Sequence, residues 1–87
     1  MKTKNFADVI RRQLEADQEL VKAVAEEERK ANIAQQFYDI RMRGNLSQRQ
    51  SAKLIGVKVS VVRKVEDADY DGDAATEILN MLIRARQ

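Results

Sequence analysis

Apolar residues recur every three or four positions along most of this chain, which is the spacing of an amphipathic α-helix. The first such stretch lies between Asn5 and Asp17, whose side chains can each accept a hydrogen bond from a first helical turn. We therefore predict one helix that begins at Asn5 and a longer one that begins at Asp17 and runs to about Arg43. The first helix would carry four apolar residues: Phe6, Val9, Ile10 and Leu14.

The longer helix is predicted to have one apolar stripe with an interruption. Leu20 and Val24 begin the stripe. A second group continues it: Ile33, Ala34, Phe37 and Ile40. The charged run EEERK, residues 26–30, separates the two groups, so we expect a bend or an exposed span there.

The valines of LIGVKVSVVRKVE, residues 54–66, fit two different periods. Alternate valines from Val57 to Val61 fit a β-strand, whereas Val61, Val62 and Val65 share one face of a helix. The chain offers no second strand to pair with, and an isolated strand is not stable. We therefore interpret this stretch as helical, despite the β-propensity of valine.

Cap and turn signals divide residues 44–66 into two short helices. Ser47 followed by Gln50 is the pattern of a capping box, in which each side chain bonds to the other residue's backbone amide. The first helix would end at Gly56, since glycine tolerates a left-handed backbone. Its buried side would consist of Ala52, Leu54 and Ile55. Two short helices joined by about three residues form a helix-turn-helix.

The acidic segment DADYDGD, residues 67–73, precedes the last predicted helix and opens like a calcium-binding loop. The twelfth position of such a loop requires a bidentate carboxylate, but Ile78 stands there and Glu77 is one residue short. We expect a hydrated turn that caps the last helix, with no specific Ca²⁺ site and no cofactor.

The last helix has a broader apolar face than a small core needs. Five residues can serve the core: Ala75, Ile78, Leu79, Leu82 and Ile83. Met81 and part of the rest would be left over, and such a surplus suggests a homodimer contact.

Charge is unevenly distributed, although the net charge is only +2. Residues 40–65 hold no acid and seven bases: Arg41, Arg43, Arg49, Lys53, Lys58, Arg63 and Lys64. Residues 15–28 hold six acids and one lysine, and residues 66–73 hold five acids and no base. A basic segment of this kind fits a polyanionic partner if folding gathers the bases on one surface.

Composition narrows the class of protein. A length of 87 residues predicts one small domain. Cys and His are both absent, which removes disulfides, the commonest general base and the commonest zinc ligand. No apolar run approaches the ~20 residues of a membrane span. The N-terminal residues do not form a secretory signal, so we expect a cytoplasmic protein.

The stretch LSQRQSAKLIGVKVSVVRKVE, residues 46–66, resembles the helix-turn-helix of the phage-repressor (Xre, Cro/repressor-like) family. The residues that fall on the family's pattern are Leu46, Ser47, Gln48, Ala52, Leu54, Gly56, Val57, Ser60, Val62 and Glu66. Residues 17–41 resemble the N-terminal extension of HigA-type antitoxins, with matches at Asp17, Glu19, Leu20, Ile33, Ala34, Phe37 and Arg41. The resemblance implies an all-α, repressor-like helix-turn-helix bundle with an N-terminal helical extension. Residues 1–30 would form the extension, a candidate partner-binding segment, and residues 31–87 the DNA-binding domain.

The resemblance also implies roles for individual residues. Gln48 and Arg49 would contact phosphates of double-stranded operator DNA. Other residues would enter or flank the major groove: Lys58, Val59, Ser60, Arg63 and Lys64. Val61 lies between the outward and inward faces and could serve either, and Val59 could instead be ordinary packing. Arg41 and Glu66 match a buried structural ion pair.

Two positions depart from the family's pattern. Val59 stands where the family often has a Gln that can grip adenine, and Lys58 stands where a small capping residue such as Ser is common. Base recognition would then depend on apolar contact with thymine methyl groups rather than on an amide.

These features favour a dimeric, sequence-specific repressor that is the antitoxin of a type II toxin–antitoxin pair, with a RelE-like toxin implied as partner. They also fit a phage or plasmid repressor without a toxin. A protein-interaction adaptor that has lost DNA binding would leave the basic segment without a role. An enzyme is the least favoured class, because the usual activating base is missing.

Overall fold

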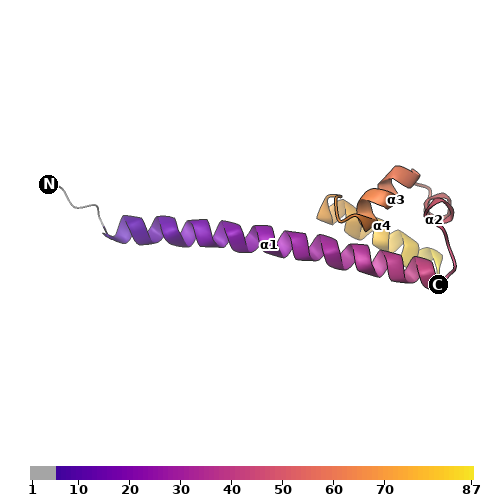
Figure 1. Cartoon of the computed structure of the whole chain (residues 1–87), viewed down its shortest axis with the longest axis horizontal. Coiled ribbons are helices and arrows are strands. Elements are labelled where there is room, and N and C mark those ends of the chain that lie inside the picture. The colour runs from indigo at the N-terminus through magenta and orange to yellow at the C-terminus, as the bar shows by residue number, and fades with distance from the viewer. Residues whose placement is uncertain (1–5) are drawn as a thin grey trace.

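The computed structural model describes residues 6–87, and these residues form four α-helices (Figure 1). Their bounds are Phe6–Arg43 for α1, Gln48–Ile55 for α2, Val59–Glu66 for α3 and Gly72–Ala85 for α4. The predicted all-α class is confirmed for the described residues, and the valines of residues 57–65 belong to a turn and a helix rather than a strand.

α1 is one continuous helix of 38 residues, roughly 57 Å long, and not two helices. The prediction that Asp17 caps a second helix is wrong, because Asp17 lies inside α1. No glycine or proline stands near it to interrupt the helix, and an aspartate in a helix interior costs only a fraction of a kcal/mol. Asn5, the predicted cap of the first helix, lies outside the described residues.

The EEERK run passes through α1 without interrupting the helix (Figure 1). Glu27 and Glu28 are exposed, as the charge pattern predicted. Arg29 instead reaches α4, where it donates hydrogen bonds to Asp73 at 2.7 Å and to Thr76 at 3.3 Å. The run therefore marks the place where α1 begins to contact the other helices.

The core forms against one side of the second half of α1. Ile33 and Phe37 are buried there, and Phe37 has no exposed surface. The other helices contribute the remaining buried apolar residues: Ala52, Ile55, Val62, Val65, Ala75, Ile78, Leu79 and Leu82. Isolated helices of eight residues are not stable in water, so α2 and α3 depend on this core.

The first half of α1 projects beyond the core (Figure 1). Leu20 and Val24 are 64% and 49% exposed, so the prediction of one stripe that joins them to Phe37 is wrong. The reason is the 3.6-residue turn, which places Leu20 and Val24 roughly 140° around the helix from Ile33 and Phe37. The two apolar groups therefore lie on different sides of the same helix.

Local signals determine the ends of α2. Ser47 caps the helix and accepts a hydrogen bond from the Gln50 amide at 3.0 Å, while Gln50 Oε1 accepts one from the Ser47 amide at 2.7 Å. This confirms the predicted capping box. Gly56 ends the helix with a φ of 76°, the left-handed conformation expected there. Leu54 was predicted to be buried but is 48% exposed, because it lies beside the face that carries Ser51, Ala52 and Ile55.

Two helices end in the left-handed conformation without a glycine. Asn45 follows α1 with a φ of 56°, and Ala68 follows α3 with a φ of 57°. At the end of α3, the Asp69 amide donates a hydrogen bond to the Lys64 carbonyl at 2.9 Å. The Ala68 amide donates one to the Val65 carbonyl at 3.1 Å. These are the two bonds of a Schellman motif, in which a Cβ costs roughly 1 kcal/mol.

α4 begins at an aspartate cap and closes the core. The Asp71 carboxylate accepts a hydrogen bond from the Ala74 amide at 3.0 Å, as expected of a turn that caps the last helix. Gly72 is buried, and a Cβ there would meet the Glu26 and Arg29 side chains of α1. Met81 is partly buried and packs against the core, so the exposed surplus predicted for α4 at this residue is not found.

Ser51 is a buried polar residue whose hydroxyl forms no hydrogen bond within residues 6–87. An unpartnered hydroxyl in a core destabilises the fold, so Ser51→Ala should raise the free energy of unfolding by about 1 kcal/mol. Urea unfolding measures this change. Ser60→Ala is the matched control, because Ser60 is an exposed helical serine and should change stability by less than about 0.5 kcal/mol. A loss of stability in Ser51→Ala would contradict the interpretation.

Candidate nucleic-acid interface

Three residues, Gly56, Val57 and Lys58, connect α2 to α3. Val62 and Val65 bury one side of α3 against the core. The other side remains in solvent, since positions three and four residues apart share a helix face. Three residues predicted to contact DNA lie on that exposed side: Ser60, Arg63 and Lys64.

The bases of residues 40–65 are on the surface, with one exception. The exposed ones are Arg43, Arg49, Lys53, Lys58, Arg63 and Lys64. Arg43 is the last residue of α1, and the others belong to α2, α3 and the turn between them. This part of the sequence contains no acid. Arg41 is the exception, because its side chain is only 11% exposed.

Val59 was predicted to face outward, but it is partly buried and packs against the core. It is the first residue of α3, and it lies close to the turn that carries the half-buried Val57. Val61 is partly buried in the same way, and Gln48 is also partly buried. These residues therefore have less free surface for DNA than the sequence indicated.

Lys58 occupies the cap position of α3, and its side chain makes no capping hydrogen bond. An ammonium group cannot accept a hydrogen bond from the amides of the first turn. The Lys58 side chain is exposed, so its charge is available at the N-terminal end of α3.

Arg41 and Glu66, predicted to pair, form a two-pronged ion pair between α1 and the end of α3. Arg41 Nε donates to Glu66 Oε2 and Arg41 Nη2 to Glu66 Oε1, both at 2.8 Å. Arg41 Nη1 also donates to the Leu46 carbonyl at 3.0 Å, and the guanidinium lies 5.3 Å from the centre of the Tyr38 ring. The hydrogen bonds with Glu66 raise the pKa of Arg41, although desolvation opposes this, so the arginine stays charged.

The Arg29 contacts with α4 were not predicted from the sequence. Asp73 and Thr76 lie more than forty residues away along the chain, and Asp73 was assigned only to an acidic turn. Residues 66–73 contain several carboxylates close together. Their positions in the sequence therefore do not indicate which one pairs with Arg29.

No known family, curated protein or solved structure matches this chain. Its own residues are therefore the basis for a functional proposal. Within residues 6–87, no group of three or more His, Cys, Asp or Glu side chains lies close enough together to hold a metal ion. In the same range, no helix combines the length and the apolar character needed to cross a membrane.

Removal of Glu66 should destabilise the fold strongly. Glu66→Ala leaves the guanidinium of Arg41 enclosed without its counter-charge, which costs about 3 kcal/mol for a well-buried pair. Thermal and urea unfolding measure the loss. Glu28→Ala is the control, because Glu28 is an exposed acid and should change stability by less than about 0.5 kcal/mol. Equal, small effects of both substitutions would show that the pair contributes little.

Proposed function

We propose that this chain is a sequence-specific DNA-binding repressor in which α2 and α3 act as a helix-turn-helix of the repressor type. The observation that carries the proposal is the exposed side of α3, which presents bases without an acid, while valines on the other side are buried in the core. Such a helix can enter the major groove, where its side chains reach base edges.

The residues divide into two roles in this proposal. Arg49, exposed in the first turn of α2, contacts a phosphate together with the amides at the start of that helix. Lys58, Ser60, Arg63 and Lys64 belong to the surface of α3 that enters or flanks the groove. Val59 and Val61 support α3 from the core side and offer only their remaining exposed surface to thymine methyl groups.

A dimer on a palindromic operator is part of the proposal. One α3 of eight residues reads only a few base pairs, and two copies on successive half-sites double the recognised sequence. The sequence suggested a dimer contact at Met81 of α4. Met81 packs against the core, so it does not support a dimer contact there.

The resemblance to HigA-type antitoxins extends the proposal to a RelE-like toxin as partner. The structure leaves the first half of α1 without contacts to the core helices, and residues 15–28 carry six acids and one lysine. A surface of this charge suits a basic RNA-cleaving protein. The second candidate is a phage or plasmid repressor without a toxin, and a small basic protein encoded beside this one would distinguish the two.

DNA binding can be tested with the promoter of the protein's own operon and a scrambled duplex. We expect tighter binding to the promoter, and an affinity that falls steeply with salt because phosphate contacts release counterions. Arg49→Ala should weaken binding to both duplexes. It should also reduce the slope of log affinity against log salt concentration by about one unit. Fluorescence titrations at several salt concentrations measure both effects.

Substitutions on α3 should act differently from Arg49→Ala. Ser60→Ala and Lys58→Ala should mainly change which bases are preferred, by roughly 1–3 kcal/mol per affected base pair. Lys22→Ala, which removes an exposed lysine from the first half of α1, is the control and should leave DNA binding unchanged. Equal affinity for promoter and scrambled DNA would contradict the proposal of a sequence-specific repressor. It would favour a protein-interaction adaptor instead.

A separate prediction concerns the interface with the toxin. A chain without residues 1–22 keeps Glu26 and Arg29, and hence every contact of α1 with α4 described above. It should retain DNA binding but lose most of its ability to neutralise the toxin in a co-expression growth assay. Full neutralisation by the shortened chain would refute the assignment of this segment to the toxin interface.

A further inference from the structure

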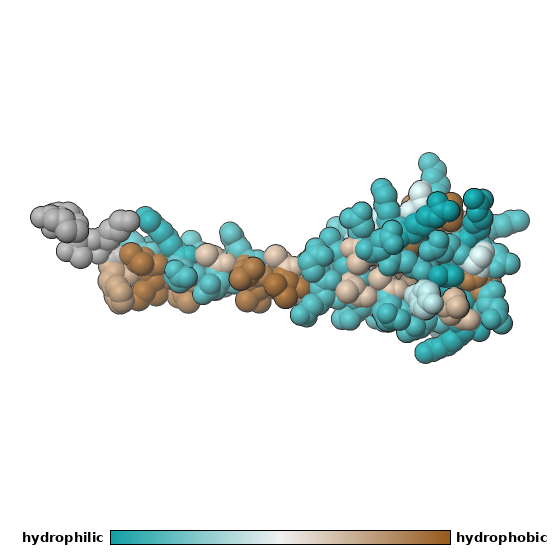
Figure 2. Space-filling model, in the orientation of Figure 1, coloured by the Kyte–Doolittle hydropathy of each residue, from teal (hydrophilic) through white to brown (hydrophobic). Residues whose placement is uncertain are grey.

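The projecting half of α1 carries an apolar face that no other part of the described structure covers (Figure 2). Its large apolar residues are between 42% and 75% exposed: Phe6, Val9, Ile10, Leu14, Leu20, Val21 and Val24. Figure 2 shows them as two brown groups on the same side of the helix, separated by polar residues. An exposed apolar face of this extent marks a contact surface.

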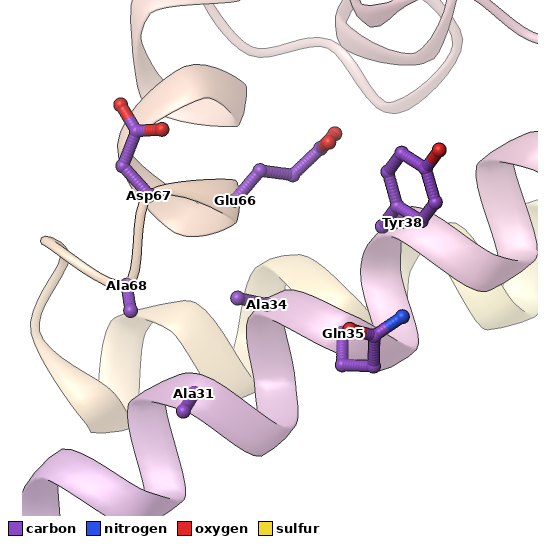
Figure 3. Close-up of a pocket in the computed structure, with 7 residues that line it drawn as sticks. All are labelled: Ala31, Ala34, Gln35, Tyr38, Glu66, Asp67 and Ala68. Carbon is purple, nitrogen blue, oxygen red and sulfur yellow. The ribbon is translucent and has the colours of Figure 1, made fainter.

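The second group continues into a track that reaches the end of α3. Leu20, Val21 and Val24 line a shallow hollow, and Val24 also lines the next one together with Ala31. Ala31 in turn lines a third hollow, between α1 and the residues that follow α3 (Figure 3). The small side chains of Ala31, Ala34 and Ala68 leave this hollow open. We call this continuous surface the α1 track.

The charged residues that line the α1 track are all acidic: Glu27, Glu28, Glu66 and Asp67. Glu66 is neutralised by Arg41, and Glu27 lies 3.7 Å from Lys30. Neither Glu28 nor Asp67 forms an ion pair within residues 6–87. The α1 track therefore combines an apolar surface with two acidic side chains, Glu28 and Asp67, that no base neutralises within residues 6–87.

Most bases of α1 lie away from this face, and the two that reach its edge, Lys30 and Arg41, are paired with Glu27 and Glu66. Arg29 is turned toward α4, where it bonds to Asp73. By the 3.6-residue period, Arg11 and Lys22 lie on the same side as Arg29, and Arg12 lies on the side of Lys30. A second copy that docked face to face would therefore bring acids against acids, and DNA would be repelled in the same way.

We propose that the α1 track is the docking surface for a cationic amphipathic helix of a protein partner. Leucine-like residues of that partner would cover Leu20, Val21 and Val24, and its lysines or arginines would face Glu28 and Asp67. The surface is inferred from α1 and the end of α3 alone. Only the identification of the partner with the toxin rests on the function proposed above.

The test uses a fluorescent peptide whose leucines and lysines repeat with the helical period, titrated with the full-length chain. We expect saturable binding that weakens with added salt. The double variant Leu20→Gln, Val24→Gln should weaken binding about tenfold or more, because two apolar contacts are lost. Leu54→Gln is the matched control, since Leu54 is 48% exposed and Val24 49%, and it should leave binding unchanged.

Two charge variants test the acidic edge. Glu28→Gln and Glu19→Gln each remove one exposed acid from α1, but only Glu28 lines the track. Glu28→Gln should weaken peptide binding about threefold at low salt and less at high salt, whereas Glu19→Gln should have no effect. The same peptide with glutamate in place of lysine should not bind.

Several outcomes would overturn the inference. Equal binding of the glutamate peptide, or equal losses in Leu54→Gln and the double variant, would show unspecific adsorption. Absence of binding would show that the track does not take a cationic segment. Sedimentation that shows a dimer of the unaltered chain but a monomer of the double variant would assign the track to a second copy. DNA binding is measured separately, so these failures are distinguishable from failure of the repressor proposal.

Discussion

The guanidinium of Arg41 joins three segments of the chain. It bonds to Glu66 at the end of α3 and to the carbonyl of Leu46 in the connection to α2, and it lies over the ring of Tyr38 on α1. α2 and α3 are too short to be stable alone, so their placement depends on such contacts and on the apolar core. The orientation of the exposed side of α3 relative to α1 therefore depends on this enclosed ion pair together with the core contacts of Val62 and Val65.

The fold separates two surfaces of opposite charge along a single helix. The bases of residues 40–65 lie at the end of the molecule that contains α2 and α3. Of the acids of residues 15–28, the first three lie on the projecting half of α1, and the last three lie where α1 begins to contact α4. A polyanion and a cationic protein would thus be drawn to different ends. Because α1 is continuous between the ends, it keeps them apart without a flexible linker.

The caps and turns that depend on neighbouring residues could be predicted from the sequence. Of the contacts between distant residues, the Arg41–Glu66 pair was predicted, and only through the family resemblance. The cap at Ser47 and the turn at Gly56 are local, and they were identified correctly. The acidic turn was also expected to cap the last helix, although Asp71 was not singled out as the cap. The partial burial of Val59 and the bonds of Arg29 depend on helices that meet only after folding. The continuity of α1 was missed because an aspartate that caps a helix and one that lies inside it have the same appearance in sequence.

The two halves of α1 differ in packing, and they therefore differ in their free energy of local unfolding. The amides near Ile33 and Phe37 can exchange their hydrogens with water only when the core opens, because α3 and α4 cover this part of the helix. The amides between Val9 and Val24 are held by intrahelical bonds alone, so they can exchange through fraying that leaves the core intact. An unbroken ribbon in the structure thus corresponds to a helix whose outer turns unwind and re-form many times within the lifetime of the folded core.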